Sequence, residues 1–231
     1  MKIRNSIALV TGANRGLGRA FVQALLDAGA KKIYAAARDP QSIKIPGVEP
    51  LRVDVTSMRD VVAAANVATD VNLVINNAGI FRPTPLLGAD DADLRAEMDT
   101  NYFGTLAMSR AFAPVLARNG GGALVNVLSA LSWVNLPGTA LYSASKAAGW
   151  SLTNALRDEL RAQNTQVVAL HVGYMDTDMT KDVQAPKSNP LDVARQVLAA
   201  LENGSSEVLA DDVSRQVKKG LSAEPTVHVA A

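Results

Sequence analysis

The sequence of 231 residues contains no cysteine. Without a thiol there can be no disulfide framework, no zinc–thiolate site, no iron–sulfur cluster and no thiolate nucleophile. Two histidines are present, His171 at the end of a predicted strand and His228 near the C-terminus. Neither has a third ligand at metal-binding spacing, so we interpret them as a packed core residue and a surface residue. We expect no bound metal.

The sequence also lacks an excess of charge of either sign. There are 23 Lys and Arg side chains against 22 Asp and Glu, and no basic run is longer than the pairs Lys31-Lys32 and Lys218-Lys219. Such a balance provides no global field that would attract nucleic acid or an acidic membrane surface. We expect neither as a partner.

Long apolar runs are missing as well. The charged start of the chain, residues 1–6, is followed by an apolar run over residues 7–10 only, which is too short for the core of a signal peptide. No stretch approaches the roughly 18 uninterrupted apolar residues that a membrane helix needs. We therefore expect a cytoplasmic protein.

What is present is the composition of one folded α/β domain. Hydrophobic residues make up 48% of the chain, charged residues 19% and aromatic residues 4%, which argues against a disordered or fibrous protein. The length fits a single domain over residues 1–231 without a second lobe. Residues 222–231 show no periodicity, and we interpret them as a loose tail or an arm that contacts a partner.

Short apolar runs bounded by turn residues alternate with longer stretches of helical periodicity, which is the pattern of βαβ units. The predicted strands cover residues 7–10, 32–36, 50–53, 71–75, 122–128, 167–172 and 207–210. The predicted helices cover residues 17–28, 56–68, 90–117 with an expected kink at Pro114, 138–161 and 190–201. The pattern predicts a parallel sheet covered by helices.

A glycine-rich turn follows the first strand directly. Residues 11–18 read Thr-Gly-Ala-Asn-Arg-Gly-Leu-Gly, and an apolar helical face begins right after them. Glycines let such a turn approach a pyrophosphate, Gly18 lets the helix pack close to the strand, and the helix N-terminus offers free N–H groups to the phosphates. A purely structural turn is the alternative, but the position in the first βαβ unit favours a dinucleotide site.

The end of the second strand bears on which dinucleotide binds. Residues 35–37 are alanines followed by Arg38, where an NAD site usually places an acid for the ribose 2′-hydroxyl. An arginine suits a 2′-phosphate instead, and Arg15 in the glycine turn would lie on the same side of the ribose. Asp39 is the competing candidate, but Asp39-Pro40 is typical of the start of a turn and would face away. We expect NADP(H) in preference to NAD(H).

Three further residues are candidates for catalysis. Tyr142 and Lys146 lie four positions apart in a predicted helix, so both project from one face. Ser129 closes a predicted strand, at the carboxyl edge where open parallel sheets bind ligands. By itself, the pair is equally explained as an ordinary tyrosine and lysine on the protein surface. Together with the glycine turn and the serine, they point to a site.

In their order along the chain, these motifs resemble those of the short-chain dehydrogenase/reductase family. The resemblance covers nearly the whole chain and rests on the glycine turn, Asp54 after the third strand, residues 76–79 after the fourth, Asn101, the three candidates above, and residues 173–177 after the sixth. It implies a single-domain, Rossmann-like, doubly wound sheet of seven parallel strands and a nicotinamide-dependent oxidoreductase. It is also compatible with a homodimer or homotetramer in which Trp150 meets another subunit, although Trp150 fits a core position equally well.

The resemblance implies a role for each catalytic residue, namely Asn101, Ser129, Tyr142 and Lys146. Tyr142 would protonate the carbonyl oxygen during reduction and Ser129 would orient that oxygen. Lys146 would favour ionisation of the phenol, whose ordinary pKa is about 10, and would hold the nicotinamide ribose. Asn101 would hold a water that links Lys146 to solvent.

Cofactor contacts are expected along the same motifs. Asp54 can accept a hydrogen bond from the adenine amino group, and Thr177 resembles the residue that holds the carboxamide. The side chains of Asn76 and Asn77 are explained equally well as ties between strands. Because this chain has Val172-Gly173 where family members often have Pro-Gly, we expect a freer loop after the sixth strand. The expected cofactor-binding residues are Gly12, Asn14, Arg15, Gly16, Leu17, Gly18, Arg38, Asp54, Val55, Asn77, Ala78, Gly79, Tyr142, Lys146, Gly173, Met175 and Thr177.

The substrate should lie between the stretch after Ser129 and the loop after the sixth strand. Its expected contacts are Ser129, Leu131, Trp133, Asn135, Leu136, Tyr142, Tyr174, Met179 and Val183. These residues are mostly apolar and include no pair of arginines, which favours a small uncharged ketone or aldehyde. The sequence therefore predicts an NADPH-dependent carbonyl reductase or alcohol dehydrogenase. The alternative is a non-catalytic NADP(H)-binding sensor, which would typically lack the tyrosine or the lysine. A sugar-nucleotide epimerase would normally need a larger C-terminal lobe.

Overall fold

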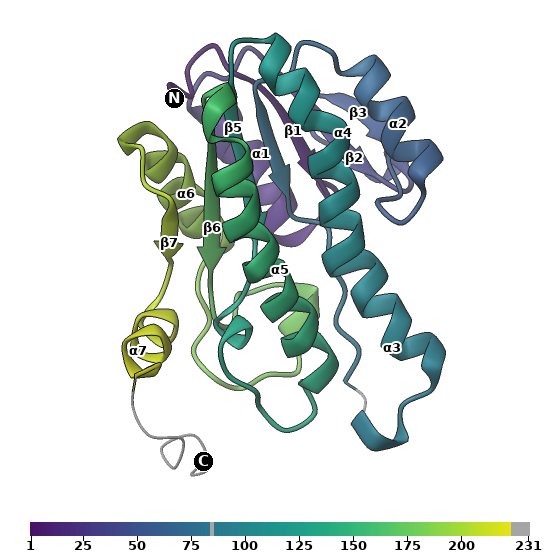
Figure 1. The fold of residues 1–231 in the computed structure, drawn as a ribbon, viewed down its shortest axis with the longest axis vertical. Helices are drawn as coiled ribbons and strands as arrows, with labels where there is room; N and C mark the ends of the chain where they lie inside the picture. Colours follow the sequence, from purple (N-terminus) through teal and green to yellow (C-terminus); the bar gives the residue numbers. More distant parts are fainter. Residues whose placement is uncertain (84–85, 223–231) are drawn as a thin grey trace.

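The computed structural model describes residues 1–83 and 86–222. Figure 1 shows a parallel sheet of seven strands with helices packed on both faces. The strands are β1 Ile7–Thr11, β2 Lys32–Ala37, β3 Glu49–Arg52, β4 Leu73–Asn76, β5 Gly122–Val127, β6 Thr165–His171 and β7 Glu207–Leu209. The helices are α1 Gly16–Asp27, α2 Met58–Val67, α3 Asp91–Met98, α4 Thr105–Arg118, α5 Ala140–Glu159, α6 Pro190–Asn203 and α7 Asp212–Gly220. The doubly wound, Rossmann-like fold expected from the sequence is confirmed.

The strand order β3-β2-β1-β4-β5-β6-β7 places a topological switch point between β1 and β4. The chain moves outward from β1 to β3, then returns to the other side of β1 and continues to β7. Ala8 of β1 accordingly pairs with Ile33 of β2 on one side and with Leu73 of β4 on the other. Ligands of open parallel sheets bind at the carboxyl ends of the strands beside such a point. This edge lies at the bottom of Figure 1.

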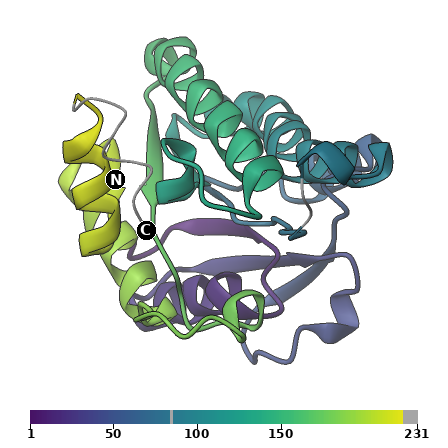
Figure 2. The ribbon, with the colours of Figure 1, turned by 90° about the horizontal axis from the view of Figure 1, so that it is seen from below.

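The core consists of two apolar layers, one on each face of the sheet. Successive residues of β1 alternate between them, with Ala8 and Val10 in one layer and Leu9 in the other. Phe21 of α1 belongs to the first layer and Phe112 of α4 to the second, and both rings are fully buried. Figure 2 shows α1 and α6 on one side of the sheet and α4 and α5 on the other. Burial on both faces explains why the central strands are continuous apolar runs.

The helix predicted over residues 90–117 is two helices joined by a π-helical turn. α3 ends at Met98, the turn η3 covers Asp99–Gly104, and α4 then continues through Pro114. The departure from α-helical geometry is therefore at η3 rather than at Pro114. Its cause is tertiary, because the side chain of Asn101 in this turn bonds to the backbone of Ile80, outside the helix.

Helix α7 was not predicted from the sequence. It is short and polar, and it begins where the Asp211 carboxylate accepts a hydrogen bond from the Ser214 N–H at 2.8 Å. Ser214 also donates from its hydroxyl to the carbonyl oxygen of His171 at the end of β6. Residues 223–231, with His228 and nearly all of the predicted tail, lie outside the described residues. Among residues 1–83 and 86–222, no helix is both long and apolar enough to span a bilayer.

Candidate functional site

The glycine turn between β1 and α1 has a backbone that larger residues do not readily adopt. Gly12 has a φ of 64° and Gly16 a φ of 51°, both in the left-handed region. A Cβ atom on Gly18 would lie 2.0 Å from the carbonyl oxygen of Gly12, so any side chain there would force the turn open. No side chain caps the N-terminus of α1, which leaves its first N–H groups available for an anion.

The loop after β4 lies directly against this turn. The Thr11 hydroxyl accepts hydrogen bonds from the N–H groups of Asn77 and Ala78, at 2.9 and 3.0 Å. The Asn77 side chain donates to the carbonyl oxygen of Thr11 at 2.9 Å, and Asn76 donates to the Asn126 side chain at 2.9 Å. Both amides therefore tie strands and loops together, which was one of their two sequence interpretations. Contact of the loop with a cofactor stays a prediction.

Charged residues gather where the adenosine end of a dinucleotide is expected. Arg38 is exposed at the end of β2. The pKa of Asp54 is lowered overall. Partial burial alone would raise it, but hydrogen bonds from Thr56 and the nearby charges of Arg38 and Arg52 have the larger, opposite effect. Asp39 accepts from the Gln41 N–H at 2.9 Å and so begins a turn, as its sequence predicts.

The loop after β6 closes over the glycine turn from the other side. A Cβ atom on Gly16 would lie 3.3 Å from Cγ2 of Thr177, so these two segments are in close proximity. The guanidinium of Arg15 pairs with the Asp178 carboxylate at 3.4 Å, and both side chains are largely exposed. Thr177 and Arg15 thus come together, as expected for one binding site.

The same loop is tied down, contrary to the freer loop expected from Val172-Gly173. The Gly173 N–H donates to the Asp211 carboxylate at 2.6 Å. The Ser188 N–H donates to the Tyr174 carbonyl oxygen at 2.8 Å, and the Asp176 N–H donates to the Ser188 carbonyl oxygen at 3.0 Å. These hydrogen bonds hold residues 173–176 to Asp211 and Ser188.

Tyr142, Lys146 and Ser129 converge at the carboxyl edge of the sheet. The Lys146 side chain is only 5% exposed and donates to the Val127 carbonyl oxygen at 2.9 Å. Its Nζ lies 5.4 Å from the centre of the Tyr142 ring. The Ser129 hydroxyl accepts from the Leu131 N–H at 3.1 Å and donates to the Val172 carbonyl oxygen at 3.3 Å, which fixes its orientation. The three residues predicted as catalytic therefore form one cluster.

The protonation of this cluster is set by its surroundings. Burial raises the pKa of Tyr142 to about 12, and the Glu97 carboxylate acts in the same direction, whereas the Ser129 hydroxyl lowers it. Burial lowers the pKa of Lys146 to about 8, against the effect of Glu97. Tyr142 is therefore a protonated phenol at neutral pH, while Lys146 titrates close to neutrality.

Asn101 lies in the π-helical turn and faces the loop after β4. Its Oδ1 accepts from the Ile80 N–H at 2.9 Å, and its Nδ2 donates to the Ile80 carbonyl oxygen and to the Ser145 hydroxyl. A Cβ atom on Gly79 would lie 3.1 Å from Oδ1 of Asn101 and 3.7 Å from Nζ of Lys146, so these two groups flank Gly79. Both N–H donors of the side-chain amide are used, and its Oδ1 accepts one hydrogen bond. The main-chain carbonyl oxygen of Asn101 accepts from the Thr105 hydroxyl at 2.9 Å; contact of Asn101 with a water stays a prediction.

The predicted substrate contacts differ in how they are placed. The ring of Trp133 stacks on His171 with centroids 3.8 Å apart, and meets Trp150 edge to face at 6.1 Å. Trp133 thus belongs in part to the packing around β6. Leu136 and Met179 are exposed, and Leu131, Tyr174 and Val183 are partly exposed. Their contact with a substrate stays a prediction.

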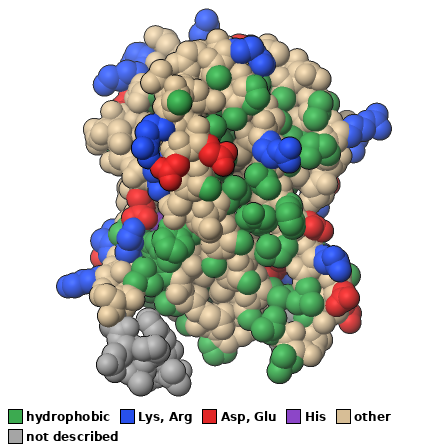
Figure 3. All heavy atoms as spheres, in the orientation of Figure 1, with side chains coloured by type: hydrophobic (Ala, Val, Ile, Leu, Met, Phe, Trp, Pro, Cys, Tyr) green, Lys and Arg blue, Asp and Glu red, His purple; other side chains and the backbone are tan. Residues whose placement is uncertain are grey.

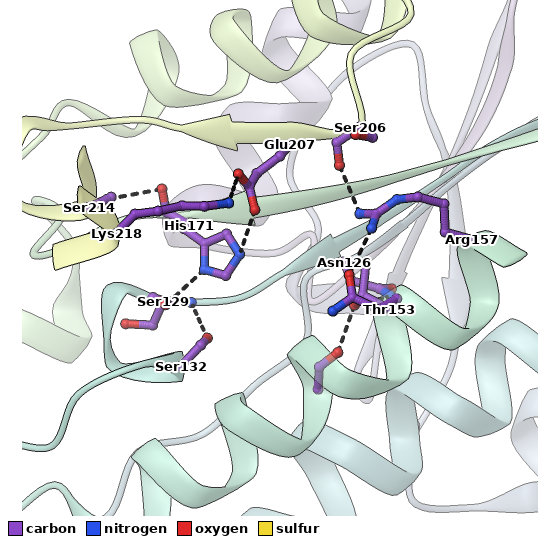
Figure 4. A network of polar contacts seen from close by, with 12 residues as sticks. Asn126, Ser129, Ser132, Thr153, Arg157, His171, Ser206, Glu207, Ser214 and Lys218 are labelled. Atoms are coloured by element: carbon purple, nitrogen blue, oxygen red, sulfur yellow. Dashed lines mark hydrogen bonds and ion pairs between the residues drawn. The ribbon is translucent and has the colours of Figure 1, made fainter. Parts of the chain in front are cut away.

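His171 is part of a buried polar network behind Ser129 (Figure 4). Its Nδ1 lies 3.0 Å from the Ser129 carbonyl oxygen, and its Nε2 lies 3.8 Å from the Glu207 carboxylate, which pairs with Lys218. Burial lowers the pKa of His171 to about 4. The ring is neutral and packed at physiological pH, in line with its interpretation as a core residue.

Two residues at the site were missed by sequence reasoning. The ring of Phe81 meets that of Tyr142 edge to face at 5.4 Å. Glu97 is completely buried, and its Oε1 accepts from the Arg82 N–H at 2.5 Å. The spacing of Glu97, four residues before Asn101, was the available signal, because it places both side chains about one turn apart on the helical segment.

Comparison with known proteins gives consistent results. The family model described as short chain dehydrogenase matches residues 6–188. A solved structure of a short chain dehydrogenase from Burkholderia cenocepacia, in complex with NADP, is 43% identical and superposes with a TM-score of 0.93, covering 98% of this chain and 97% of that one. A galactitol 2-dehydrogenase (L-tagatose-forming) from Cereibacter sphaeroides is 35% identical over an aligned length of 190, which covers 78% of this chain and 75% of the relative. A 3-oxoacyl-[acyl-carrier-protein] reductase from Synechocystis sp. is 31% identical over an aligned length of 192, which covers 78% of each chain.

Proposed function

Since the chain belongs to the short-chain dehydrogenase family and is an oxidoreductase that interconverts CH–OH and C=O groups, we propose that it is an NADP(H)-dependent reductase of small, mostly apolar ketones or aldehydes, with alcohol oxidation as the reverse reaction. The family membership expected from the order of the motifs is confirmed. The observation that carries the proposal is the cluster of Tyr142, Lys146 and Ser129 at the carboxyl edge, beside the glycine turn.

The glycine turn and its neighbours fit a dinucleotide. Gly12, Gly16 and Gly18 leave room for close approach of a pyrophosphate, and the uncapped N-terminus of α1 supplies N–H donors. Arg38 and Arg15 would bind the 2′-phosphate, which favours NADP(H) over NAD(H). The similar Burkholderia cenocepacia structure is in complex with NADP, which supports the same choice. When bound, the reduced nicotinamide supplies the hydride.

The chain itself supplies the proton. We infer that the Tyr142 hydroxyl donates its proton to the carbonyl oxygen of the substrate and recovers one from the alcohol in the reverse direction. Ser129 lies on the same side; its hydroxyl, which donates to the Val172 carbonyl oxygen at 3.3 Å in the structure, would turn to donate to the substrate oxygen and so orient it. Lys146 has a pKa of about 8, so it exchanges protons readily near neutral pH and can restore the proton of Tyr142. Water bound at the carbonyl oxygen of Asn101 would connect Lys146 to solvent.

The chemistry around Tyr142 supports a mostly apolar substrate. Phe81 packs against its ring, and Leu131, Tyr174 and Met179 are among the residues predicted from the sequence to meet the substrate. A non-catalytic sensor has no support, because Asn101, Ser129, Tyr142 and Lys146 are all present.

We also propose that the chain is a single dinucleotide-binding domain that forms a homodimer or homotetramer. Figure 3 shows hydrophobic side chains gathered over α4 and α5, and Phe103 at the start of this region is half exposed. Trp150 is partly exposed on α5. Light scattering coupled to size-exclusion chromatography tests this proposal, and a monomer at micromolar concentration would contradict it.

Activity measurements on a tyrosine variant test the proposed reaction. Wild-type protein should oxidise NADPH in the presence of a small ketone or aldehyde, followed by nicotinamide absorbance. Tyr142→Phe should lower kcat by about 10²- to 10⁴-fold, because it removes the proton donor and leaves the ring packing intact. Tyr34→Phe is the matched control, since Tyr34 bonds to Asp70 away from the site. Normal activity of Tyr142→Phe would overturn the assignment.

A further inference from the structure

Glu97 of α3 is a buried carboxylate that the proposed reaction does not yet use. It is 0% exposed, and its Oε1 accepts from the Arg82 N–H at 2.5 Å. Its Oε2 is also buried and has no hydrogen-bond partner among the described residues. An acid in such a place is unfavourable for stability unless nearby charges compensate it. Its position beside the catalytic cluster indicates a functional reason.

Glu97 and Asn101 together hold the segment formed by residues 80–82. Asn101 bonds to both the N–H and the carbonyl oxygen of Ile80, and Glu97 bonds to the N–H of Arg82. The residue between these two anchors is Phe81, whose ring packs against Tyr142. Loss of the Glu97 anchor would therefore release one end of the segment that supports the tyrosine.

The charge of Glu97 also faces the catalytic residues. α3 packs against α5, which carries Tyr142 and Lys146; Arg82 lies in the loop after β4, and Asp93 lies on the same helix as Glu97. Burial raises the pKa of Glu97, and Asp93 acts in the same direction, whereas Arg82 and Lys146 lower it. In return the carboxylate raises the pKa of Lys146 and so counteracts the effect of burial on the ammonium group.

We propose that Glu97 is a positioning residue of this site, whose carboxylate holds residues 80–82 against Tyr142 and places a negative charge on the helix that packs against α5. The inference rests on the proposed roles of Tyr142 and Lys146. It assigns Glu97 two separable effects, one through a hydrogen bond and one through charge.

Two substitutions separate these effects. Glu97→Gln keeps an oxygen that can accept from the Arg82 N–H but removes the charge. Glu97→Leu has a similar volume and removes both. Asp93→Asn is the matched control, because Asp93 is the other acid on α3 near Arg82 and carries no proposed role.

The first measurement needs no catalytic activity. The protein is labelled with 13C at the lysine ε-carbons, and the resonance of Lys146, assigned by its loss in Lys146→Met, is titrated with pH. We expect a midpoint near 8 in the wild type and one lower by about half to one pH unit in Glu97→Gln and Glu97→Leu. Asp93→Asn should stay within about 0.2 unit of the wild type. An unchanged midpoint in Glu97→Gln would overturn the role of the charge.

The second measurement is the pH profile of kcat/KM for NADPH-dependent ketone reduction. In Glu97→Gln the limb controlled by Lys146 should move to lower pH, while the plateau stays within about threefold of the wild type. In Glu97→Leu the plateau should also fall by about tenfold or more, because a misplaced segment beside the reacting groups is costly to the rate. A plateau equal to that of Glu97→Gln would overturn the anchoring role. If the wild type reduces no carbonyl compound, the proposed function fails, and the NMR titration still decides whether Glu97 sets the charge of Lys146.

Discussion

Replacement of Arg38 by alanine tests the preference for NADPH over NADH. Arg38 is exposed at the end of β2 and lies near the Asp54 carboxylate, which is where the adenosine ribose is expected. A bound 2′-phosphate would accept charge-assisted hydrogen bonds from its guanidinium, and NADH has no such group. The variant should therefore weaken NADPH binding and leave NADH binding unchanged.

The magnitude follows from the exposure of the residues involved. A hydrogen bond to a charged group contributes about 1.5–3 kcal/mol, and exposure of Arg38 favours the lower end, which corresponds to about 10- to 30-fold in Kd. Arg15 is tied to Asp178 at 3.4 Å, with 71% and 73% of the two side chains exposed. Such a pair is worth less than about 1 kcal/mol, so Asp178→Asn should release Arg15 and tighten NADPH binding by about two- to fivefold.

Titration of nucleotide fluorescence at a fixed salt concentration measures both dissociation constants for each variant. Arg118→Ala at the end of α4 is the control for loss of one exposed positive charge, because it lies at the opposite edge of the sheet. The reasoning would be refuted if Arg38→Ala weakened NADH binding as much as NADPH binding. It would be refuted equally if NADPH bound to Arg38→Ala as tightly as to the wild type.

Three further predictions concern stability and the cofactor turn. Because burial lowers the pKa of His171 to about 4, the unfolded chain takes up a proton as the pH falls through 6.5, whereas the folded protein does not. The unfolding free energy should therefore drop by up to about 3 kcal/mol between pH 6.5 and 4. In urea denaturation of His171→Gln, this dependence of the unfolding free energy on pH should be absent. Asn126→Ala should lower the unfolding free energy by about 2–4 kcal/mol, because the buried side chain of Asn76 and that of Thr153, shown beside Asn126 in Figure 4, each lose a partner. The exposed control Asn203→Ala should change the unfolding free energy by less than about 0.5 kcal/mol, and equal effects would contradict the argument. Gly18→Ala should weaken NADPH binding by more than about tenfold, since its Cβ would overlap the Gly12 carbonyl oxygen, whereas Gly220→Ala, with no described atom within 4 Å of its Cβ, should bind normally in the same titration.

Much of the fold was predictable because the sheet is buried on both faces. Each of the seven strands overlaps an apolar run predicted from the sequence, with ends displaced by a few residues. The catalytic cluster was predictable for a related reason. Ser129 follows β5 and Tyr142 and Lys146 share one face of α5, so the order of elements alone brings them to the carboxyl edge of the sheet.

Other features had no local signal. Helix α7 is short and polar, and its position depends on contacts of Asp211 and Ser214 with the loop and strand that precede them. The freer loop expected from Val172-Gly173 was wrong, because the hydrogen bonds that restrain this loop come from residues such as Ser188, which lie outside the local sequence. The π-helical turn at Asp99–Gly104 likewise depends on a bond between Asn101 and Ile80, 21 positions apart.

The sequence by itself determined the seven strands, most of the helices, and which side chains stand at the ends of the strands. These properties depend on periodicity and on chain order, which are local. The tertiary structure alone decided which groups influence the catalytic residues. Glu97 is one acid among several in α3, and only the packing of this helix against α5 and the loop after β4 buries it where its charge acts on Lys146. Burial and the field of nearby charges are properties of the assembled fold, because they depend on atoms that are far apart in the chain.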